Sequence, residues 1–197
     1  MSNYLQRLLL VGIGVPVLVL LILYVPQFNH LPIAILVLLF CAGSGLELLH
    51  MIEPGSSLAR KTSVLFLCLS PVLATYLYGL LFNQESLISI WLIPSSLFLL
   101  AGFSLSAATA AFPISEKNIP GALEKLSYNA FYIMYPGMLG SSIMAMLSIK
   151  EHSAQYLLWF MIIVFGNDSL AWLVGITIGK KRNIFMVSPK KSLEGLI

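Results

Sequence analysis

Long uncharged, apolar stretches alternate along the chain with short segments that hold nearly all of the charged residues. Most of these stretches have about the 20 residues that an α-helix needs to cross a hydrocarbon layer about 30 Å thick. The pattern predicts an all-α, polytopic membrane protein with about six transmembrane helices, at residues 8–25, 31–52, 62–83, 86–105, 126–149 and 153–179. Residues 1–197 then form a single membrane domain, in which residues 180–197 are a basic cytoplasmic segment.

Two departures from regular helix are predicted. Residues 106–125 include Pro113 and Pro120 and are more polar than their neighbours, so we expect a loop there, with or without one surface helix. Within the fifth predicted span, Tyr135-Pro136-Gly137 predicts a kink, because proline lacks the N–H group that a helix interior uses.

Composition agrees with a membrane location. Of the 197 residues, 58% are hydrophobic and 10% are charged, whereas soluble domains have roughly 25% charged residues. Cys41 and Cys68 lie inside apolar stretches and are expected to be buried free thiols. The His, Cys and acidic residues do not have the spacing of a zinc site. The small net charge of +3 does not indicate nucleic acid as a partner.

The basic residues predict the orientation, because cytoplasmic loops of membrane proteins are enriched in Lys and Arg. With a cytoplasmic N-terminus, six spans leave only Lys150 of the 11 Lys and Arg residues on the far side. Both termini are therefore predicted to be cytoplasmic, in a multi-pass protein of the inner (cytoplasmic) membrane. The residues on the cytoplasmic side are Arg7, Arg60, Lys61, Lys117, Lys125, Lys180, Lys181, Arg182, Lys190 and Lys191.

Asp168 is the only aspartate of the sequence and lies inside the sixth predicted span. A carboxylate there costs at least ~2.5–3.5 kcal/mol unless it is paired, bound to a cation or in a wet cavity. Ala171, Gly175 and Gly179 follow at i+3, i+7 and i+11 and place a face of small residues beside the acid. With the amide of Asn167 next to it, this face suits a cation or a ligand. The alternative is a structural ion pair or a protonated, hydrogen-bonded acid.

The sequence after this span is basic. Residues 180–182 are Lys-Lys-Arg and either bind a phosphate or contact anionic lipid head groups. Ser188 suits a helix N-cap and Pro189 the first helical position, so a helix is predicted to start there. Lys190 and Lys191 would lie in its first turn, where they oppose the helix dipole. They favour an anion, such as a phosphate, bound at the exposed amides.

Together, residues 167–195 resemble the phosphatidate cytidylyltransferase family, the CDP-diacylglycerol synthases. In that family D-x-x-A-Y-x-x-G-x-x-x-G-K precedes S-P-K-K-T-x-E-G; here Trp172 stands for the tyrosine and Ser192 for the threonine. Glu47, near the end of the second span, resembles an acid in an early helix of the family. Elsewhere the resemblance is one of hydropathy.

The resemblance implies a membrane nucleotidyltransferase of phospholipid biosynthesis that converts CTP and phosphatidate to CDP-diacylglycerol and pyrophosphate. It implies that Asp168 helps to bind Mg²⁺, alone or with a second cation, and that Asp168, Lys190 and Lys191 are catalytic residues. The residues implied to bind substrate are Ser188, Lys180 and Asn167. The implied partners are CTP, phosphatidate and membrane lipid, together with a second copy of the chain or a missing C-terminal half.

A second family motif, roughly K-[RK]-x-x-x-x-K-D followed by P-G-H-G-G-x-x-D-R-x-D, does not occur in these 197 residues. We therefore expect the chain to correspond to the N-terminal two-thirds of a family member and to be incomplete as an enzyme. Two alternatives stay open: a non-catalytic membrane remnant or partner subunit, and a small cation transporter that uses Asp168. A transporter needs a second ionisable position on a facing helix, for which Glu47 is the candidate.

Overall fold

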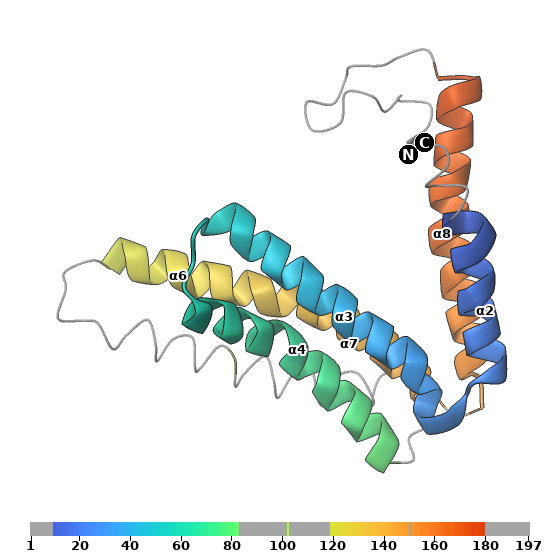
Figure 1. Cartoon of the computed structure of the whole chain (residues 1–197), viewed down its shortest axis with the longest axis horizontal. Coiled ribbons are helices and arrows are strands. Elements are labelled where there is room, and N and C mark those ends of the chain that lie inside the picture. The colour runs from blue at the N-terminus through green and yellow to red at the C-terminus, as the bar shows by residue number, and fades with distance from the viewer. Residues whose placement is uncertain (1–9, 83–101, 103–118, 150, 180–197) are drawn as a thin grey trace. The chain divides into compact units, whose positions relative to one another are not determined.

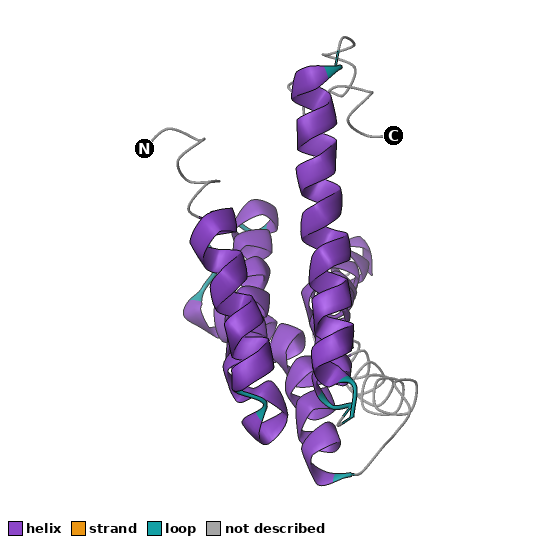
Figure 2. Cartoon of the chain, turned by 90° about the vertical axis from the view of Figure 1, so that its right-hand side faces the viewer, coloured by secondary structure: helices purple, strands orange, loops and turns teal. Residues whose placement is uncertain are grey.

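The computed structural model describes residues 10–82, 102, 119–149 and 151–179 (Figure 1). In this part of the chain all regular structure is helical and there is no strand (Figure 2), as the sequence predicts. The chain forms two units, Met1–Ala154 and Gln155–Ile197. The described elements of the first unit are η1 (Leu10–Gly14), α2 (Val15–Tyr24), α3 (Gln27–Ile52), α4 (Leu58–Leu81), α6 (Ile119–Tyr132), η2 (Ile133–Met138) and α7 (Leu139–Leu147).

Several of the described helices are long enough to cross a membrane. The apolar candidates are Gln27–Ile52, Leu58–Leu81, Leu123–Leu147 and Ser153–Thr177. The third of these is made of α6, η2 and α7, which are continuous along the chain and which we call the α6–α7 rod. The fourth is α8 (Ser153–Thr177), which begins at the end of the first unit and continues into the second. The chain is therefore a multi-pass membrane protein.

Agreement with the predicted spans is good for α3, α4 and α8, whose ends differ from the predictions by at most a few residues. The span predicted at residues 8–25 corresponds to a shorter apolar helix, Gly12–Tyr24. The span predicted at residues 86–105 lies outside the described residues, except for Gly102.

At the C-terminal end of residues 106–125, where a loop with or without a helix is predicted, the structure has a helix: α6 begins at Ile119 and continues into the fifth predicted span. Pro120 is the second residue of this helix. Proline is tolerated there because the first N–H groups of a helix have no partner within it. A proline that looked like a loop signal is therefore compatible with a helix start.

The chain enters α3 through a left-handed turn. Residues 28–30 have φ values of 51°, 51° and 54°, and the right-handed part of α3 begins directly after them, at the predicted start of the second span. Residues other than glycine lose about 1–2 kcal/mol each in this conformation, so tertiary contacts must hold it. The Tyr76 hydroxyl donates a hydrogen bond to the Phe28 carbonyl. The buried His30 ring shares a hydrogen bond with the Ser153 hydroxyl, Nε2 to Oγ 2.8 Å.

The α3, α4 and α6–α7 helices lie side by side (Figure 1). Along α4 and the α6–α7 rod, the residue numbers of the contacting pairs increase in the same direction, so α4 and the rod run parallel. The pairs are Cys68 with Tyr132, Pro71 with Gly137, and Gly79 with Ser148. Along α3 and α4 the numbers change in opposite directions, because Tyr76 contacts Phe28 whereas Cys68 lies against Gly45. α3 is therefore antiparallel to both.

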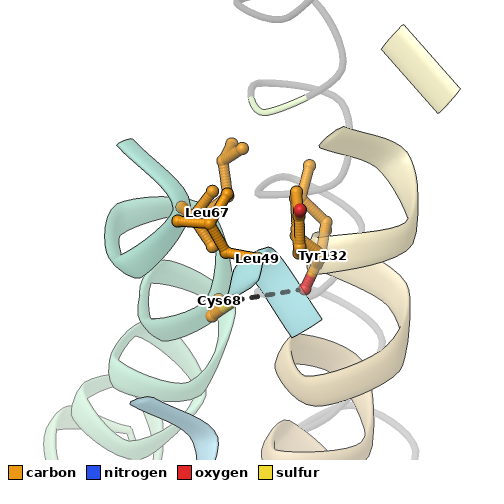
Figure 3. Packing of buried hydrophobic residues seen from close by; sticks show 6 residues of the cluster. Leu49, Leu67, Cys68 and Tyr132 are labelled. Carbon is orange, nitrogen blue, oxygen red and sulfur yellow. Dashed lines mark hydrogen bonds between the residues drawn. The ribbon is translucent and has the colours of Figure 1, made fainter. Parts of the chain in front are cut away.

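Small residues allow these helices to approach closely, as is usual where lipid gives little hydrophobic drive for helix association. A Cβ added at Gly45 would lie 2.7 Å from Cys68 Sγ, and one added at Gly137 would lie 2.8 Å from Pro71 Cγ. Around this contact a core cluster joins all three helices (Figure 3). Its buried members are Leu49, Val64, Leu67, Cys68, Tyr132 and Ile133.

The predicted kink at Tyr135-Pro136-Gly137 takes the form of a π-helical turn, η2. Pro136 has no N–H to donate to the carbonyl of Tyr132, four residues earlier. A π-helix, with its i→i+5 hydrogen bonds, absorbs such a defect. The Cys68 thiol also donates to the Tyr132 carbonyl, Sγ to O 3.5 Å (Figure 3). Cys41 and Cys68 are both free and buried, as predicted.

Candidate functional site

Asp168 lies in the second half of α8, inside the candidate membrane span Ser153–Thr177. Nine residues separate it from the end of the helix, or about 14 Å at the helical rise. Asp168 and its neighbour Asn167 are exposed along α8, whereas Ala171 and Gly175 on the predicted small face are half-buried. The acid is thus on a continuous helix next to small residues, as the sequence predicts.

The basic residues predicted to act with Asp168 lie outside the described residues. They are Lys180, Ser188, Lys190 and Lys191. Their position relative to the acid therefore stays a prediction.

Asp168 alone fits part of a magnesium site. Among the described residues, no three His, Cys, Asp or Glu side chains come together in a way that could hold a metal ion. Mg²⁺ is, however, commonly bound by one or two carboxylates, with substrate phosphates and waters as the other ligands. An exposed carboxylate beside small residues can supply one such ligand.

Glu47 lies on α3, five residues before its end, and its side chain is exposed. It belongs to the first unit, whereas Asp168 belongs to the second. The pairing of these two acids that a transporter would need is therefore still a prediction.

A polar pocket of about 410 Å³ lies where α3 ends and where α4 and the α6–α7 rod begin. We call this end of the helices the pocket end. Its lining residues come from the turn between α3 and α4, from the start of α4, and from α6. They are Glu53, Ser56, Ser57, Arg60, Ser63, Lys125 and Asn129.

The turn that builds one wall of this pocket is short and well capped. Gly55 has a φ of 81°, a left-handed conformation that glycine adopts without strain. Ser57 is the N-cap of α4, and its hydroxyl accepts a hydrogen bond from the Arg60 backbone N–H at 3.3 Å. The turn therefore presents Glu53 and Arg60 to each other.

Arg60 joins all three helices at the pocket end. Its Nη2 donates to Glu53 Oε1 at 2.7 Å, and its Nε lies 3.1 Å from both carboxylate oxygens. Its Nη1 donates to Oδ1 of the buried Asn129 at 2.8 Å. Its guanidinium carbon lies 5.7 Å from the centre of the Tyr132 ring, a cation–π arrangement. The Arg60 side chain is 20% exposed and that of Glu53 30%.

Sequence reasoning missed this pocket. From the sequence, Arg60 and Lys125 were used only to predict the orientation in the membrane. Glu53 and Asn129 were not identified at all. A usable signal was present, since Glu53 and Arg60 have opposite charges and flank a Gly-Ser turn between two apolar helices. The contribution of Asn129 depends on the packing of α6 against α4, 69 positions away from Arg60 in the sequence.

Comparison with known proteins gives two similarities. A model of the cytidylyltransferase family matches residues 5–197. Among curated proteins, the chain is similar to the phosphatidate cytidylyltransferase of Aquifex aeolicus (strain VF5), with 33% identity over 69 residues. That match covers 35% of this chain and 26% of the Aquifex protein, about a quarter of its length. No solved structure gives a significant match.

Proposed function

The chain belongs to the cytidylyltransferase family, and on this basis we propose that it converts CTP and phosphatidate to CDP-diacylglycerol and pyrophosphate in phospholipid biosynthesis. The observation that carries the proposal is the family match over residues 5–197, which includes the whole acidic and basic motif at residues 167–195. The similarity to a phosphatidate cytidylyltransferase supports phosphatidate as the lipid substrate.

In this reaction a phosphate oxygen of phosphatidate forms a bond to the α-phosphorus of CTP, and the bond from that phosphorus to pyrophosphate breaks. All reacting groups are anions, so catalysis consists mainly of aligning them and neutralising their charge. We assign contacts with the phosphate oxygens to Lys180, Ser188, Lys190 and Lys191, and a further hydrogen bond to Asn167. Bound Mg²⁺ would add positive charge at these oxygens. Asp168 is the residue assigned to hold it.

We further propose six transmembrane helices with both termini in the cytoplasm, in an inner membrane. The directions of the described helices support this. α4 and the α6–α7 rod both begin at the pocket end and run parallel, so the chain has to return to that end between Leu81 and Ile119. A fourth span at residues 86–105 would account for the return.

α8 begins at the opposite end of the first unit, where Ser153 contacts His30 at the start of α3. A sixth crossing would therefore lead the basic segment at residues 180–191 to the side of the membrane on which the pocket end lies. This is the side on which Arg60 and Lys125 are found. The proposed orientation thus gives the basic segment at residues 180–191 access to cytoplasmic CTP.

The test is CTP-dependent formation of CDP-diacylglycerol from phosphatidate, measured in membranes that contain the protein. Asp168→Asn removes the charge at nearly constant shape and should lower the rate at least about 100-fold, because even loss of the groups that support metal ligands costs about 10–100-fold. Glu151→Gln is a matched control, because Glu151 is an exposed acid in the turn before α8, and it should leave the rate within about twofold.

Removing Mg²⁺ with EDTA should abolish the activity, and adding Mg²⁺ back should restore it. Equal rates for the two variants, or product formed in EDTA, would contradict the role given to Asp168. No product from the wild-type protein with Mg²⁺ would contradict the proposed reaction.

A further inference from the structure

The pocket at the pocket end has no role in the function proposed above. From its position, its charge and its hydrogen-bond donors, we propose that it binds the phosphate-bearing head group of an anionic membrane lipid. This inference does not depend on the transferase activity.

The position of the pocket is at the level of lipid head groups. Glu53 directly follows the last residue of α3, Arg60 is the third residue of α4, and Lys125 is the third residue of the candidate span Leu123–Leu147. The hydrocarbon-crossing parts of three helices thus all begin or end at the pocket. Head groups of lipids that surround the protein lie at this depth.

The charge of the pocket favours an anion. The Glu53 carboxylate uses both oxygens in its contact with Arg60, which leaves the pair close to neutral. Lys125 has no ion-pair partner among the described residues and adds one positive charge. The N-terminus of the 24-residue helix α4 lies at the same place, and its first N–H groups add partial positive charge.

The neutral polar groups of the pocket are mainly donors or hydroxyls. Asn129 already uses its amide oxygen to accept from Arg60, so its NH₂ group remains as a donor. Ser56 and Ser63 add two hydroxyl groups. Arg60 keeps one N–H on each terminal nitrogen beyond its contacts with Glu53 and Asn129. A phosphate, whose oxygens only accept, complements such a set.

A cation suits the pocket less well than an anion does. Its carboxylate is occupied by Arg60 and its amide oxygen by the same guanidinium, so few oxygen ligands remain for a metal ion.

Exposed apolar residues on the helices that form the pocket favour a lipid over a soluble phosphate. Met51, Leu58 and Leu123 are apolar residues within a few positions of the lining residues, and they are 77%, 78% and 58% exposed. Acyl chains that leave a bound head group can cover such side chains. Inorganic phosphate would gain nothing from them, because it has no apolar surface to bury.

The test is a titration of the detergent-solubilised full-length chain with defined lipids, read by native mass spectrometry. The probes are phosphatidate and phosphatidylglycerol, with phosphatidylcholine and inorganic phosphate as comparisons. Lys125→Gln should weaken the binding of both anionic lipids about fivefold, the usual contribution of one basic residue near anionic lipid. Lys125→Arg should restore it.

Lys61→Gln is the matched control. Lys61 is adjacent to Arg60 on α4 and is exposed, but it does not line the pocket. It should change lipid binding less than about twofold, because it does not contact a head group in the pocket, although it removes the same net charge as Lys125→Gln. Thermal unfolding without lipid should be the same for both variants, because both side chains are exposed.

Equal weakening by the two substitutions would overturn the proposal, since the attraction would then be diffuse surface charge. Binding of phosphatidylcholine as tight as that of phosphatidate would also overturn it, because charge would not matter. So would binding of inorganic phosphate as tight as that of phosphatidate, which would assign the pocket to a soluble anion. A Lys125→Gln variant that fails to fold is replaced by Ser63→Ala, which removes a lining hydroxyl and should also weaken binding selectively.

Discussion

The close contact between α4 and η2 makes Gly137→Ala an informative substitution. A Cβ at this position would lie 2.8 Å from Pro71 Cγ and 3.1 Å from the Cys68 carbonyl oxygen. Carbon atoms in good contact are about 3.5–4.0 Å apart, so the first distance is short by about 1 Å. A proline ring and a backbone carbonyl have no rotamer to move into. Forcing the helices apart should destabilise the protein by about 1–3 kcal/mol.

Gly43→Ala on α3 is the matched control, because an added Cβ there meets nothing within 4 Å. Alanine favours a helix over glycine by about 1 kcal/mol, so this variant should be as stable as the wild type or slightly more stable. The assay is unfolding of the purified protein by SDS in mixed micelles. If Gly137→Ala unfolds at the same SDS fraction as Gly43→Ala, α4 and η2 do not pack in the register described above.

Two further predictions concern the pocket end and the membrane topology. A double-mutant cycle with Glu53→Gln and Arg60→Gln should give a coupling energy of about 1–2 kcal/mol in the same unfolding assay, since the contact is charged and bidentate but part-exposed. Additive effects of the two substitutions would show that the Glu53–Arg60 contact does not stabilise the protein. Reporter fusions after Gln84 and after His152 should locate both positions outside the cytoplasm. A cytoplasmic signal at either position would reverse the proposed orientation.

Hydropathy was sufficient to predict the long helices but not their packing. The bounds of α3 and α8 follow from where charged and apolar residues alternate, and the structure confirms them to within a few residues. The start of α6 was missed because Pro120 has two meanings, a loop residue or the first turn of a helix. The left-handed turn at residues 28–30 has only a weak local signal, since Asn and His tolerate this conformation better than most residues, and it is held by contacts with Tyr76 and Ser153.

For the candidate site, too, one part could be predicted from the sequence and another could not. Asp168 could be found from sequence because one acid in a long apolar stretch stands out without knowledge of any contact. The contacts of Arg60 could not be predicted in this way, because they depend on which face of α6 meets α4 and on the rotamer that brings the guanidinium to Asn129. Such long-range contacts come from helix packing, which in membranes follows small residues and shape more than any repeated pattern.

The contrast between Glu53 and Asp168 is an argument for where ligand binding should be sought. Glu53 is at a helix end and its charge is neutralised within the fold by Arg60, so it stabilises structure without any ligand. Asp168 lies well inside a candidate span, where an unpaired carboxylate costs at least ~2.5–3.5 kcal/mol, and the described residues include no cation bonded to it. That cost can be offset by a group bound to the carboxylate, by a structural ion pair or by a wet cavity. The small residues beside Asp168 leave room for such a group. Asp168 is therefore the better candidate for ligand binding and catalysis, and Glu53 is the better candidate for a structural role.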